Sequence, residues 1–451
     1  MQKILVLGAG LVARPLITYL LKNNFFVTVA SNTPESGSAM IAGASNGKSL
    51  FCDASDRATI EKLTGEHDLT VSLLPYIFHP TVARACLMHG KPMVTTSYVK
   101  EEIAAMDEEA RRKGVILLNE TGLDPGIDHM SAMRIIDAVH KKGGEIKKFY
   151  SICGALPAPE YSDNPFRYKF SWSPGGVILA SKNSAIYRDK GERIEIDSEN
   201  LFKDRFKCEF PGVGTLEVYP NRDSISYISI YGIPEAETIY RGTFRFPGWC
   251  EALDAMKAIG LLDDRVSDYS GMSFNDFTGG LIGDTAGKNG ENIAAFAGIG
   301  PDSVAMDALR WLGLFRTEDM GYGNASPINI ITDLMIKKMM LGPNEKDMTV
   351  LQHLFLASYK DGSEEVISSR MVDYGSPSSD TSVARTVGLP AAIAVKLILE
   401  GKIRETGVHR PVIPSIYNPI LEELAGLGII VIEEFGLPHD RMISRDHICR
   451  D

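Results

Sequence analysis

The sequence predicts an α/β protein with a Rossmann-type, doubly wound parallel sheet, joined by an α+β domain and a helical insertion. Three observations support this fold class. Short apolar runs alternate with helical patterns from residue 3 to residue 118. A glycine fingerprint follows the first of these runs. Strand-like runs with few helices occupy residues 147–246, and helical patterns dominate residues 248–341.

The length of the chain predicts more than one domain. It has 451 residues, which exceeds what a single hydrophobic core usually organises, so we expect two or three domains. Residues 1–125 and 385–451 are predicted to form a dinucleotide-binding domain. Residues 126–258 and 345–384 are predicted to form an α+β substrate-binding domain, and residues 259–344 a helical domain.

Composition excludes several classes of partner. The net charge of −11 disfavours a broad nucleic-acid surface. The cysteines form no Cys-x-x-Cys pair and no metal-ligand spacing, which indicates free thiols in a reducing compartment. Arg14 and Pro15 interrupt the apolar N-terminal stretch, and no other segment reaches the roughly 20 uncharged apolar residues of a membrane span. We therefore expect a cytoplasmic protein that binds neither nucleic acid nor a membrane.

The first strand–helix unit carries a dinucleotide fingerprint. Residues 3–7 are an apolar run typical of a buried parallel strand, and G-x-G-x-x-A follows over residues 8–13. Gly8 would make the tight turn, Gly10 would let a pyrophosphate approach the backbone, and Ala13 would let helix and strand pack closely. Leu11 and Val12 lie within this loop. The sequence therefore predicts a nicotinamide-dinucleotide site.

The second strand leaves the choice of cofactor open. It ends at Ser31-Asn32-Thr33, where an NAD site usually has an acid and an NADP site usually has a nearby Arg. Glu35 lies slightly beyond, and Arg14 could reach round from the first helix. Residues 42–49 resemble a phosphate loop, but they lead into a strand-like run, so no ATP site is expected.

The alternation continues to residue 118. Strands are predicted to end near Asp53, Leu74 and Thr95, and Asp53-Ala54 and Leu74 lie where a parallel sheet places its ligand. The other expected elements of this region are helices over 56–65, 79–89 and 100–113 and a strand over 115–118.

Residues 119–129 are predicted to form a turn that follows the dinucleotide-binding strands and precedes the next helix. Two Gly, one Pro and two Asp within Gly122–Asp128 indicate special backbone angles. This segment reads either as a polar linker between domains or as a site wall that carries Asp124. Asp124, Asp128 and His129 could be metal ligands or an acid/base group with its partner. No third metal ligand has useful spacing, so a role for Asp128 and His129 at the start of the following helix is favoured.

The rest of the chain predicts a mixed sheet and a helical segment. Strands are expected over 147–153, 193–196, 215–219, 225–231, 238–246, 348–359 and 364–372, with a hairpin turn at 220–223. Helices are expected over 130–140, 249–258, 292–297, 303–312, 327–340 and 386–399. The run Gly428–Ile432 is expected to return to the first domain as a strand.

Cationic residues gather near the turns of the second sheet: Arg167, Lys169, Arg222, Arg241 and Arg245. An Arg side chain matches a carboxylate with two parallel hydrogen bonds, so this cluster suggests a substrate with several carboxylates. A solvated surface with ordinary ion pairs is the alternative. Cys153 and Tyr98 could face the site or could simply pack.

Together these stretches resemble a known family, saccharopine reductase, also called saccharopine dehydrogenase (L-glutamate-forming). The resemblance covers nearly the whole chain and includes the dehydrogenase half of the bifunctional lysine-degradation enzyme. The motifs that carry it are Gly8–Pro15, Ser72–Tyr76, Thr96–Tyr98, Gly122–His129, Leu156–Glu160, Asp163–Pro165, Tyr168–Ser173, Tyr219–Ser224, Arg241–Arg245, Leu341–Pro343, Glu345–Met348 and Val387–Pro390. The segments Gly122–His129 and Tyr168–Ser173 are more specific than the fingerprint.

The resemblance implies a reversible oxidation of saccharopine by NAD or NADP to an imine, which water splits into L-glutamate and 2-aminoadipate semialdehyde. It implies an α/β substrate domain that forms a homodimer. The substrate-contacting positions it implies are Ser97, Tyr98, Asp124, Arg222, Thr243, Phe244 and Arg245. The cofactor positions it implies are Gly8, Gly10, Leu11, Val12, Ala13, Ser31, Asn32, Thr33, Asp53, Ala54 and Leu74.

Two departures from the family pattern matter. NADP-using members have Cys-Arg-Thr where this chain has Ser31-Asn32-Thr33, and the missing Arg favours NAD slightly. Ala155 replaces a Gly of the family. The family implies no single base, and Asp124, Tyr98 and Cys153 are the candidates for a catalytic role, with Asp124 placed first. No metal is expected.

Two other functions stay open at this point. One is a related nicotinamide enzyme that acts on another amino-linked substrate, such as a polyamine-forming synthase, which would have less need of several Arg residues. The other is a protein that binds the dinucleotide tightly and has no turnover of saccharopine.

Overall fold

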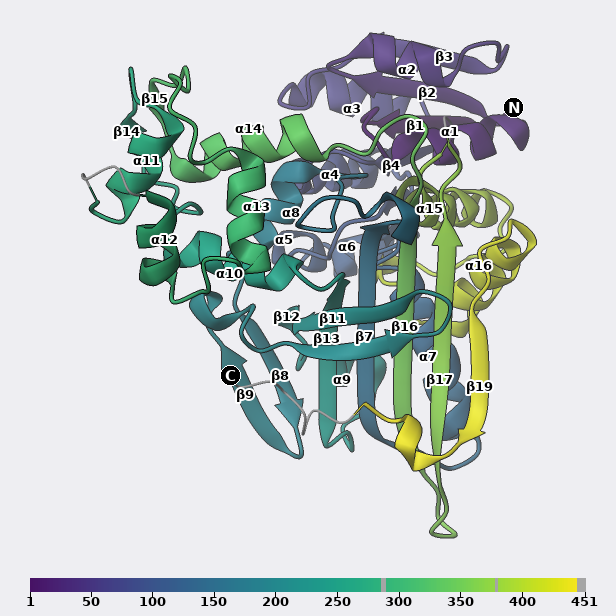
Figure 1. The fold of residues 1–451 in the computed structure, drawn as a ribbon. Coiled ribbons are helices and arrows are strands. Elements are labelled where there is room, and N and C mark those ends of the chain that lie inside the picture. The colour runs from purple at the N-terminus through teal and green to yellow at the C-terminus, as the bar shows by residue number, and fades with distance from the viewer. Residues whose placement is uncertain (285–288, 378–379, 444–451) are drawn as a thin grey trace. The chain divides into compact units, whose positions relative to one another are not determined.

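The computed structural model describes residues 1–284, 289–377 and 380–443 of the chain (Figure 1). The chain divides into two compact units. Unit 1 contains residues 1–145, 358–363 and 368–435. Unit 2 contains residues 146–357, 364–367 and 436–451, of which the last eight lie outside the described part. The division into three domains stays a prediction.

Unit 1 is built on a parallel sheet of seven strands in the order β18-β6-β5-β4-β1-β2-β3. Every neighbouring pair in this sheet is parallel, as the alternating pattern predicted. The reversal of strand order beside β1 is the arrangement that places ligands beyond the carboxyl ends of the strands. The strands are β1 (Lys3–Leu7), β2 (Phe26–Ser31), β3 (Gly47–Phe51), β4 (Leu69–Ser72), β5 (Met93–Thr95), β6 (Ile116–Leu118) and β18 (Gly407–His409).

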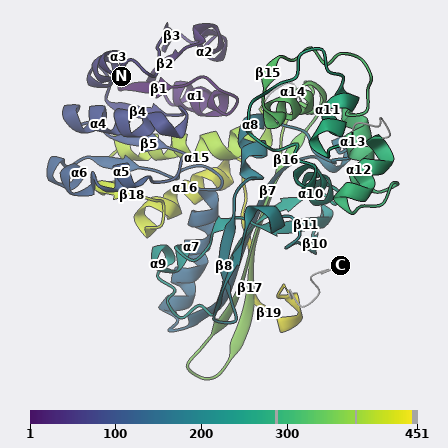
Figure 2. The same cartoon turned by 90° about the vertical axis from the view of Figure 1, so that its left-hand side faces the viewer.

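Helices cover both faces of this sheet, which confirms the doubly wound fold. In Figure 2, α3 (Arg57–Gly65), α4 (His79–His89) and α6 (Asp107–Lys113) lie on one side of the strands. On the other side lie α1 (Ala13–Lys22), α15 (Ser382–Leu399) and α16 (Pro414–Gly426). The remaining helices of unit 1 are α2 (Pro34–Met40), α5 (Glu101–Ala104), α7 (Ile127–Lys141) and a short 3-10 turn, η1 (Tyr76–Phe78).

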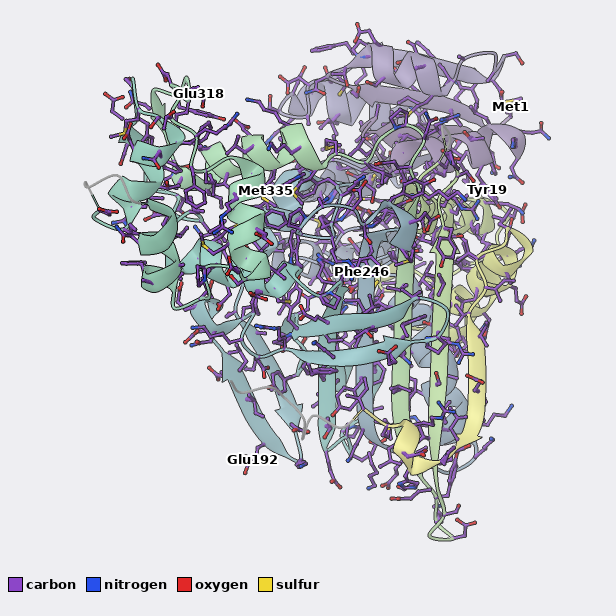
Figure 3. All side chains as sticks on the ribbon, in the orientation of Figure 1. Met1, Tyr19, Glu192, Phe246, Glu318 and Met335 are labelled. Atoms are coloured by element: carbon purple, nitrogen blue, oxygen red, sulfur yellow. The ribbon has the colours of Figure 1, made fainter. Side chains whose placement is uncertain are left out.

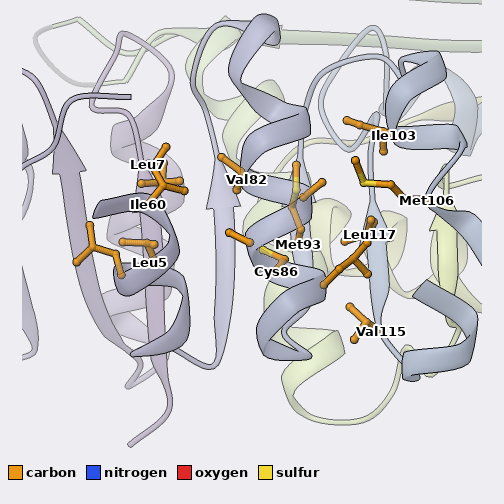
Figure 4. Close-up of a cluster of buried hydrophobic side chains, with 14 of the residues drawn as sticks. Leu5, Leu7, Ile60, Val82, Cys86, Met93, Ile103, Met106, Val115 and Leu117 are labelled. Atoms are coloured by element: carbon orange, nitrogen blue, oxygen red, sulfur yellow. The ribbon is translucent and has the colours of Figure 1, made fainter. Parts of the chain in front are cut away.

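One hydrophobic cluster fixes the helices of the first face on the sheet (Figure 4). Leu5 and Leu117 come from strands, while Ile60 and Val82 come from helices, and all four side chains are fully buried. Burying such a side chain stabilises the fold by about 1.5–3 kcal/mol. The cluster therefore holds the strand ends, where the candidate site residues begin, in fixed positions.

Two predictions in unit 1 are wrong. The expected helix over 100–113 is two helices, α5 and α6. Three acids in the first turn of α6, Asp107 to Glu109, favour a new helix start there because they interact well with a helix N-terminus. The strand that returns to the parallel sheet is β18 and not Gly428–Ile432. The latter run does not enter this sheet, and Ile430 and Ile432 are about half exposed.

The second sheet has ten strands, and Figure 1 shows its long strands side by side. Its main path is β10-β11-β13-β7-β16-β17-β19, with β8, β9 and β12 beside it. The strands are β7 (Glu145–Pro157), β8 (Ala185–Asp189), β9 (Glu192–Ile196), β10 (Phe206–Phe210), β11 (Gly214–Pro220), β12 (Arg222–Asp223), β13 (Thr238–Arg245), β16 (Asp347–Ser358), β17 (Glu364–Tyr374) and β19 (Ile432–Leu437). The predicted mixed sheet is confirmed, and β8 and β10 are strands that the sequence did not reveal.

The segment after β11 differs from prediction. Residues 220–223 do not form a hairpin turn, because Arg222 and Asp223 form β12, which pairs in parallel with β8. The expected strand over 225–231 is a helix, α9 (Tyr227–Tyr231). The Asp223 carboxylate accepts hydrogen bonds from the N–H groups of Ile225 and Ser226, which turns the chain toward a helix. Gly232, with φ +66°, ends it.

Unit 2 also contains the predicted helical segment. Its helices are α8 (Pro174–Ala180), α10 (Trp249–Ala258), α11 (Phe274–Leu281), α12 (Asn289–Ala297), α13 (Val304–Leu312) and α14 (Pro327–Met339), with a small ribbon of β14 (Ser267–Asp268) and β15 (Asn324–Ala325). Among the described helices of the chain, α15 of unit 1 is long and apolar enough to cross a membrane. Since 72% of that helix is buried inside the fold, it is weak support for a membrane span.

Candidate active site

The fingerprint loop has the shape that a pyrophosphate requires. Gly8 has φ +103°, and a Cβ at this position would lie 3.0 Å from the Leu73 carbonyl oxygen. A Cβ at Gly10 would meet no atom within 4 Å, so the space beside this backbone is open. Ala13 is fully buried, while Leu11 is 57% exposed and Val12 lies between them at the start of α1. The shape of the loop is therefore compatible with a dinucleotide, and the cofactor-binding roles of its residues stay predictions.

The remaining predicted cofactor residues lie at the carboxyl ends of neighbouring strands. Ser31 ends β2, and its Oγ accepts a hydrogen bond of 3.0 Å from the Thr33 N–H. Asn32 and Thr33 are exposed, so their side chains are accessible to a ligand. Asp53 and Ala54 follow β3, and Leu74 follows β4. Hydrogen bonds from the Ser55 N–H and hydroxyl lower the pKa of Asp53, which keeps it anionic.

Tyr98 and Asp124, both predicted site residues of unit 1, lie in contact. The Tyr98 hydroxyl donates a hydrogen bond of 3.1 Å to Asp124 Oδ1. Asp124 is half-buried in the turn between β6 and α7. This turn requires Gly126, because a Cβ there would lie 2.0 Å from the Gly122 carbonyl oxygen. The conformation that presents Asp124 is thus encoded by the glycine two residues later.

A buried carboxylate that sequence reasoning missed supports this pair. Glu120 is 2% exposed, and its Oε2 lies 2.7 Å from His129 Nε2. Its Oε1 accepts hydrogen bonds of 2.9 Å from the Val99 N–H and 2.8 Å from Arg410 Nε. The main-chain N–H of Glu120 also donates to the Ser97 carbonyl oxygen at 3.1 Å. Glu120 therefore fixes the main chain on both sides of Tyr98.

The charges around Glu120 keep it ionised. Burial alone would raise its pKa, but hydrogen bonding to His129, the positive charge of Arg410 and the Val99 N–H together lower it.

Asp128, at the start of α7, accepts a 2.5 Å hydrogen bond from the Gly126 N–H. Within the described part of the chain, no group of three or more His, Cys, Asp or Glu residues could hold a metal ion. Asp128 and His129 both support the turn, because Asp128 is hydrogen-bonded to Gly126 and His129 to Glu120.

A second missed residue, His79, contacts Ser97 from the other side. His79 is the first residue of α4 and is 1% exposed. Its Nε2 lies 2.8 Å from Ser97 Oγ, and its Nδ1 lies 2.9 Å from the hydroxyl of Ser72. Burial lowers the pKa of His79 to about 4, so its ring is neutral at physiological pH. The available signal was a His directly after the strand-end segment Ser72–Tyr76.

In unit 2, Arg245 lies at the end of β13, next to Phe246, which Figure 3 labels. Its guanidinium is surrounded by the rings of Tyr168, Tyr219 and Trp249, with centroids 5.0, 6.0 and 5.4 Å from Cζ. The side chain is 5% exposed, and its only hydrogen bond to a described residue runs from Nη1 to the Phe244 carbonyl oxygen at 2.9 Å. Among the same described residues, Nε has no hydrogen-bond partner.

No carboxylate of the described residues forms an ion pair with Arg245. Glu217 is its cross-strand neighbour on β11, but the nearest cation to that carboxylate is Arg205, whose Nε is 3.8 Å away. Burial raises the pKa values of Tyr168 and Tyr219, so these phenols are neutral as well. A buried cation normally requires a counter-charge, so an anionic ligand group is the partner that this geometry lacks.

The other predicted residues of unit 2 differ in their accessibility. Thr243 is half-buried and pairs in register with Cys153, which is 8% exposed, so both lie on the sheet face that carries Arg245. The Phe244 side chain points to the opposite face, where it is fully buried against Phe210, so only its main chain could reach a ligand. Arg222 is exposed, with φ +52°, and lines an open hollow with Asn183, Ser184, Ala185, Ile186 and Asp223.

Comparisons with known proteins agree with this geometry. The family model "Saccharopine dehydrogenase NADP binding domain" matches residues 4–118, and "Saccharopine dehydrogenase C-terminal domain" matches residues 122–429. The chain is 38% identical over 449 residues to the saccharopine dehydrogenase [NADP(+), L-glutamate-forming] of Schizosaccharomyces pombe, covering 96% of this chain and 99% of that protein. It is 35% identical to the mitochondrial alpha-aminoadipic semialdehyde synthase of Mus musculus, covering 95% of this chain and 47% of that protein.

A solved structure extends the likeness to the fold. The apo saccharopine dehydrogenase (L-Glu forming) of Saccharomyces cerevisiae superposes with a TM-score of 0.88 at 36% identity, covering 96% of this chain and all of that chain. The fungal names and the model of residues 4–118 favour NADP, so the expected preference for NAD is not supported. By sequence, by family model and by fold, the chain belongs to the saccharopine dehydrogenase family.

Proposed function

We propose that the chain oxidises saccharopine with NADP+ and water to L-glutamate, 2-aminoadipate 6-semialdehyde, NADPH and a proton, and that it catalyses the reverse reaction. The names of its relatives support the reaction and the cofactor. Lysine metabolism follows from the same names. The observation on this chain that carries the proposal is Arg245, a buried cation without a carboxylate partner among the described residues.

The surroundings of Arg245 suit a carboxylate of the substrate. The planar guanidinium is held among three aromatic rings, which orient it without neutralising its charge. A ligand carboxylate would accept hydrogen bonds from its unused N–H groups, and Nε is one of these. Saccharopine has three carboxylates, so the exposed Arg222 is proposed as a second binding group. Thr243, which is half-buried and lies two residues before Arg245 on the same face of β13, is proposed as a third contact.

The Tyr98–Asp124 pair is proposed to handle the proton. The secondary amine must lose its proton before the neighbouring carbon can give up a hydride, and water must add to the imine that results. Asp124 is proposed as the base, with Tyr98 donating to its Oδ1 and so orienting the carboxylate. Cys153 is kept as a further candidate because it lies on the sheet face that carries Arg245. Glu120 and Gly126 would hold the pair in place.

The fingerprint loop and the strand ends are proposed to hold NADP. When bound, its nicotinamide would take up the hydride from the carbon next to the amine. No acid ends β2, so no charge at that position would repel a 2′-phosphate. The exposed Asn32 and Thr33 side chains can donate hydrogen bonds to it, although the family's Arg is missing. We therefore expect NADP to be preferred by a modest factor.

A spectrophotometric assay tests reaction and cofactor together. Purified protein is mixed with saccharopine and either NAD+ or NADP+, and formation of the reduced nicotinamide is followed. Turnover with NADP+ at the higher kcat/KM supports the proposal. No turnover with either nucleotide would contradict the function, while a clear preference for NAD+ would contradict only the cofactor. Turnover of another amino-linked substrate in place of saccharopine would favour a different enzyme of the same fold.

Two further properties are proposed without a structural argument. A homodimer is expected from the resemblance, and size-exclusion chromatography with light scattering measures it. A cytoplasmic location is expected from composition, but the mammalian relatives are named mitochondrial, so fractionation of the source cells is the test.

A further inference from the structure

We infer that His79 is a positioning residue that makes the Ser97 hydroxyl a hydrogen-bond donor aimed at a carboxylate of the substrate. The inference rests on the proposed function for the identity of the ligand, but its structural part concerns the free protein alone. His79, Ser72 and Ser97 form a continuous chain of hydrogen bonds within unit 1.

The chain of hydrogen bonds joins a buried end to an accessible end. Ser72 ends β4 and is fully buried, and its hydroxyl contacts His79 Nδ1 at 2.9 Å. His79 is 1% exposed, and its Nε2 contacts Ser97 Oγ at 2.8 Å. Ser97 follows β5 and is only half-buried. Solvent or a ligand can therefore reach this row of hydrogen bonds at Ser97 and not at Ser72.

Burial of Ser72 fixes the tautomer of His79. In the described part of the chain, His79 Nδ1 is the hydrogen-bond partner of the Ser72 hydroxyl. If Nδ1 carried the proton, the Ser72 hydroxyl would have to accept, and its own proton would be buried without an acceptor. If Nε2 carries the proton, Ser72 donates to Nδ1 and every buried donor is satisfied. The second arrangement is therefore the stable one.

Thr95 points to the same tautomer. Its Oγ1 donates its single proton to the Ser72 carbonyl oxygen at 2.8 Å, since a carbonyl can only accept. Thr95 Oγ1 also lies 3.5 Å from His79 Nε2, and toward that atom it can act only as an acceptor. This longer contact agrees with a proton on Nε2, which would face an acceptor oxygen there and not a second lone pair.

The direction of these hydrogen bonds, from Ser72 through His79 to Ser97, determines what the Ser97 hydroxyl can do. Ser97 Oγ accepts from His79 Nε2, so its own proton is left for an acceptor on the accessible side. Burial that lowers the pKa of His79 to about 4 keeps the ring neutral and the direction constant at physiological pH. The main chain at Ser97 is fixed by bonds from the Glu120 N–H and to Thr95 Oγ1. Ser97 thus presents an oriented donor, which suits a carboxylate.

Nuclear magnetic resonance on the free protein tests the tautomer. The protein is labelled with 15N at histidine, and long-range 1H–15N correlations distinguish the two neutral tautomers from the charged ring. The chain has 9 His residues, and loss of one signal in His79→Gln assigns the one of interest. We expect a proton on Nε2 and none on Nδ1 at neutral pH. A proton on Nδ1, or on both nitrogens, would overturn the inference.

A double-mutant cycle in the saccharopine assay tests the role. Ser97→Ala should raise KM about tenfold with little change in kcat, as loss of one hydrogen bond to a charged group implies. His79→Leu should raise KM by a similar factor alone, but by less than about twofold in the Ser97→Ala background. An equal, additive effect of His79→Leu in both backgrounds would mean that His79 does not act through Ser97, and the inference would fail.

A third variant guards against a folding defect. His79→Gln can present an amide N–H to Ser97, so it should retain a KM closer to that of the unaltered protein than His79→Leu does. If the unaltered protein has no saccharopine turnover while the resonance result stands, the proposed function fails and the tautomer does not. If turnover is present and the tautomer is reversed, only the inference about His79 fails.

Discussion

Replacing Glu120 with Gln should destabilise unit 1 by about 2–3 kcal/mol. The carboxylate is 2% exposed and has three polar contacts, with His129, Arg410 and the Val99 N–H. Removing one partner of a fully buried ion pair costs about 3–5 kcal/mol. Arg410 is 31% exposed and can turn toward water, and a Gln carbonyl can still accept one hydrogen bond, so the lower value applies. For a unit of this size the melting temperature should fall by about 4–12 °C.

The effect of Glu120→Gln should depend on pH with a defined sign. The pKa of Glu120 is lowered by folding, so its contribution to stability is fully present above the unfolded value of 4.5. This contribution is lost as the pH falls below 4.5 through the lowered pKa of the folded state. The gap in stability between the two proteins should therefore be widest near neutral pH and should narrow in acid.

Both effects can be measured by urea unfolding at several pH values, with far-ultraviolet circular dichroism as the signal. Glu400→Gln is the matched control, since Glu400 pairs with Lys402 at 2.8 Å and both side chains are exposed, at 38% and 62%. An exposed pair contributes about 0–1 kcal/mol, so this control should change little. Equal stability losses for the two variants, or a gap for Glu120→Gln that widens in acid, would refute the reasoning.

Three further predictions concern turnover. Arg245→Lys should raise KM for saccharopine by about tenfold or more, because an ammonium cannot form the paired, ring-stacked contact of a guanidinium; Arg193→Lys on the exposed end of β9 should change nothing, and equal effects would contradict the assignment. Asp124→Asn should lower kcat strongly and remove the acidic limb of the pH–rate profile, and an unchanged profile would exclude Asp124 as the base. Asn32→Arg should raise kcat/KM with NADP+ relative to NAD+ by about tenfold, and an unchanged ratio would show that the 2′-phosphate lies elsewhere.

The parts of the fold that the sequence predicted are those with a repeating pattern. Apolar runs such as residues 4–7 are buried on both faces of the parallel sheet, so their assignment as strands follows from hydrophobicity alone. The fingerprint could be recognised because Gly8 and Gly10 are required by backbone geometry within a few residues. By contrast, β18 has three residues and no apolar run, and its place is set by pairing with β6 across almost 300 residues of sequence.

The supporting residues of the candidate site could not be predicted for a similar reason. Glu120 pairs with Arg410, and no spacing in the sequence connects two residues so far apart. The formation of helix α9 in place of the predicted strand depends on one side chain, Asp223, which accepts hydrogen bonds from the main-chain N–H groups that follow it. Tyr98 and Asp124 were found because family motifs contain both, whereas their contact is a property of the turn that Gly126 permits.

Unit 1 and unit 2 each bury a charged side chain near predicted site residues, and the electrostatic surroundings of the two charges are opposite. In unit 1 the buried charge of Glu120 is compensated by Arg410 and by hydrogen bonds, so the Tyr98 segment is fixed in the free protein. In unit 2 the buried charge of Arg245 has aromatic neighbours and no counter-charge among the described residues, which disfavours the free state. A ligand carboxylate would remove that penalty, because it supplies the missing charge only when it binds. Arg245 can therefore strengthen the binding of a ligand carboxylate while it lowers the stability of the free protein. Glu120 stabilises unit 1 and fixes the geometry of the Tyr98 segment.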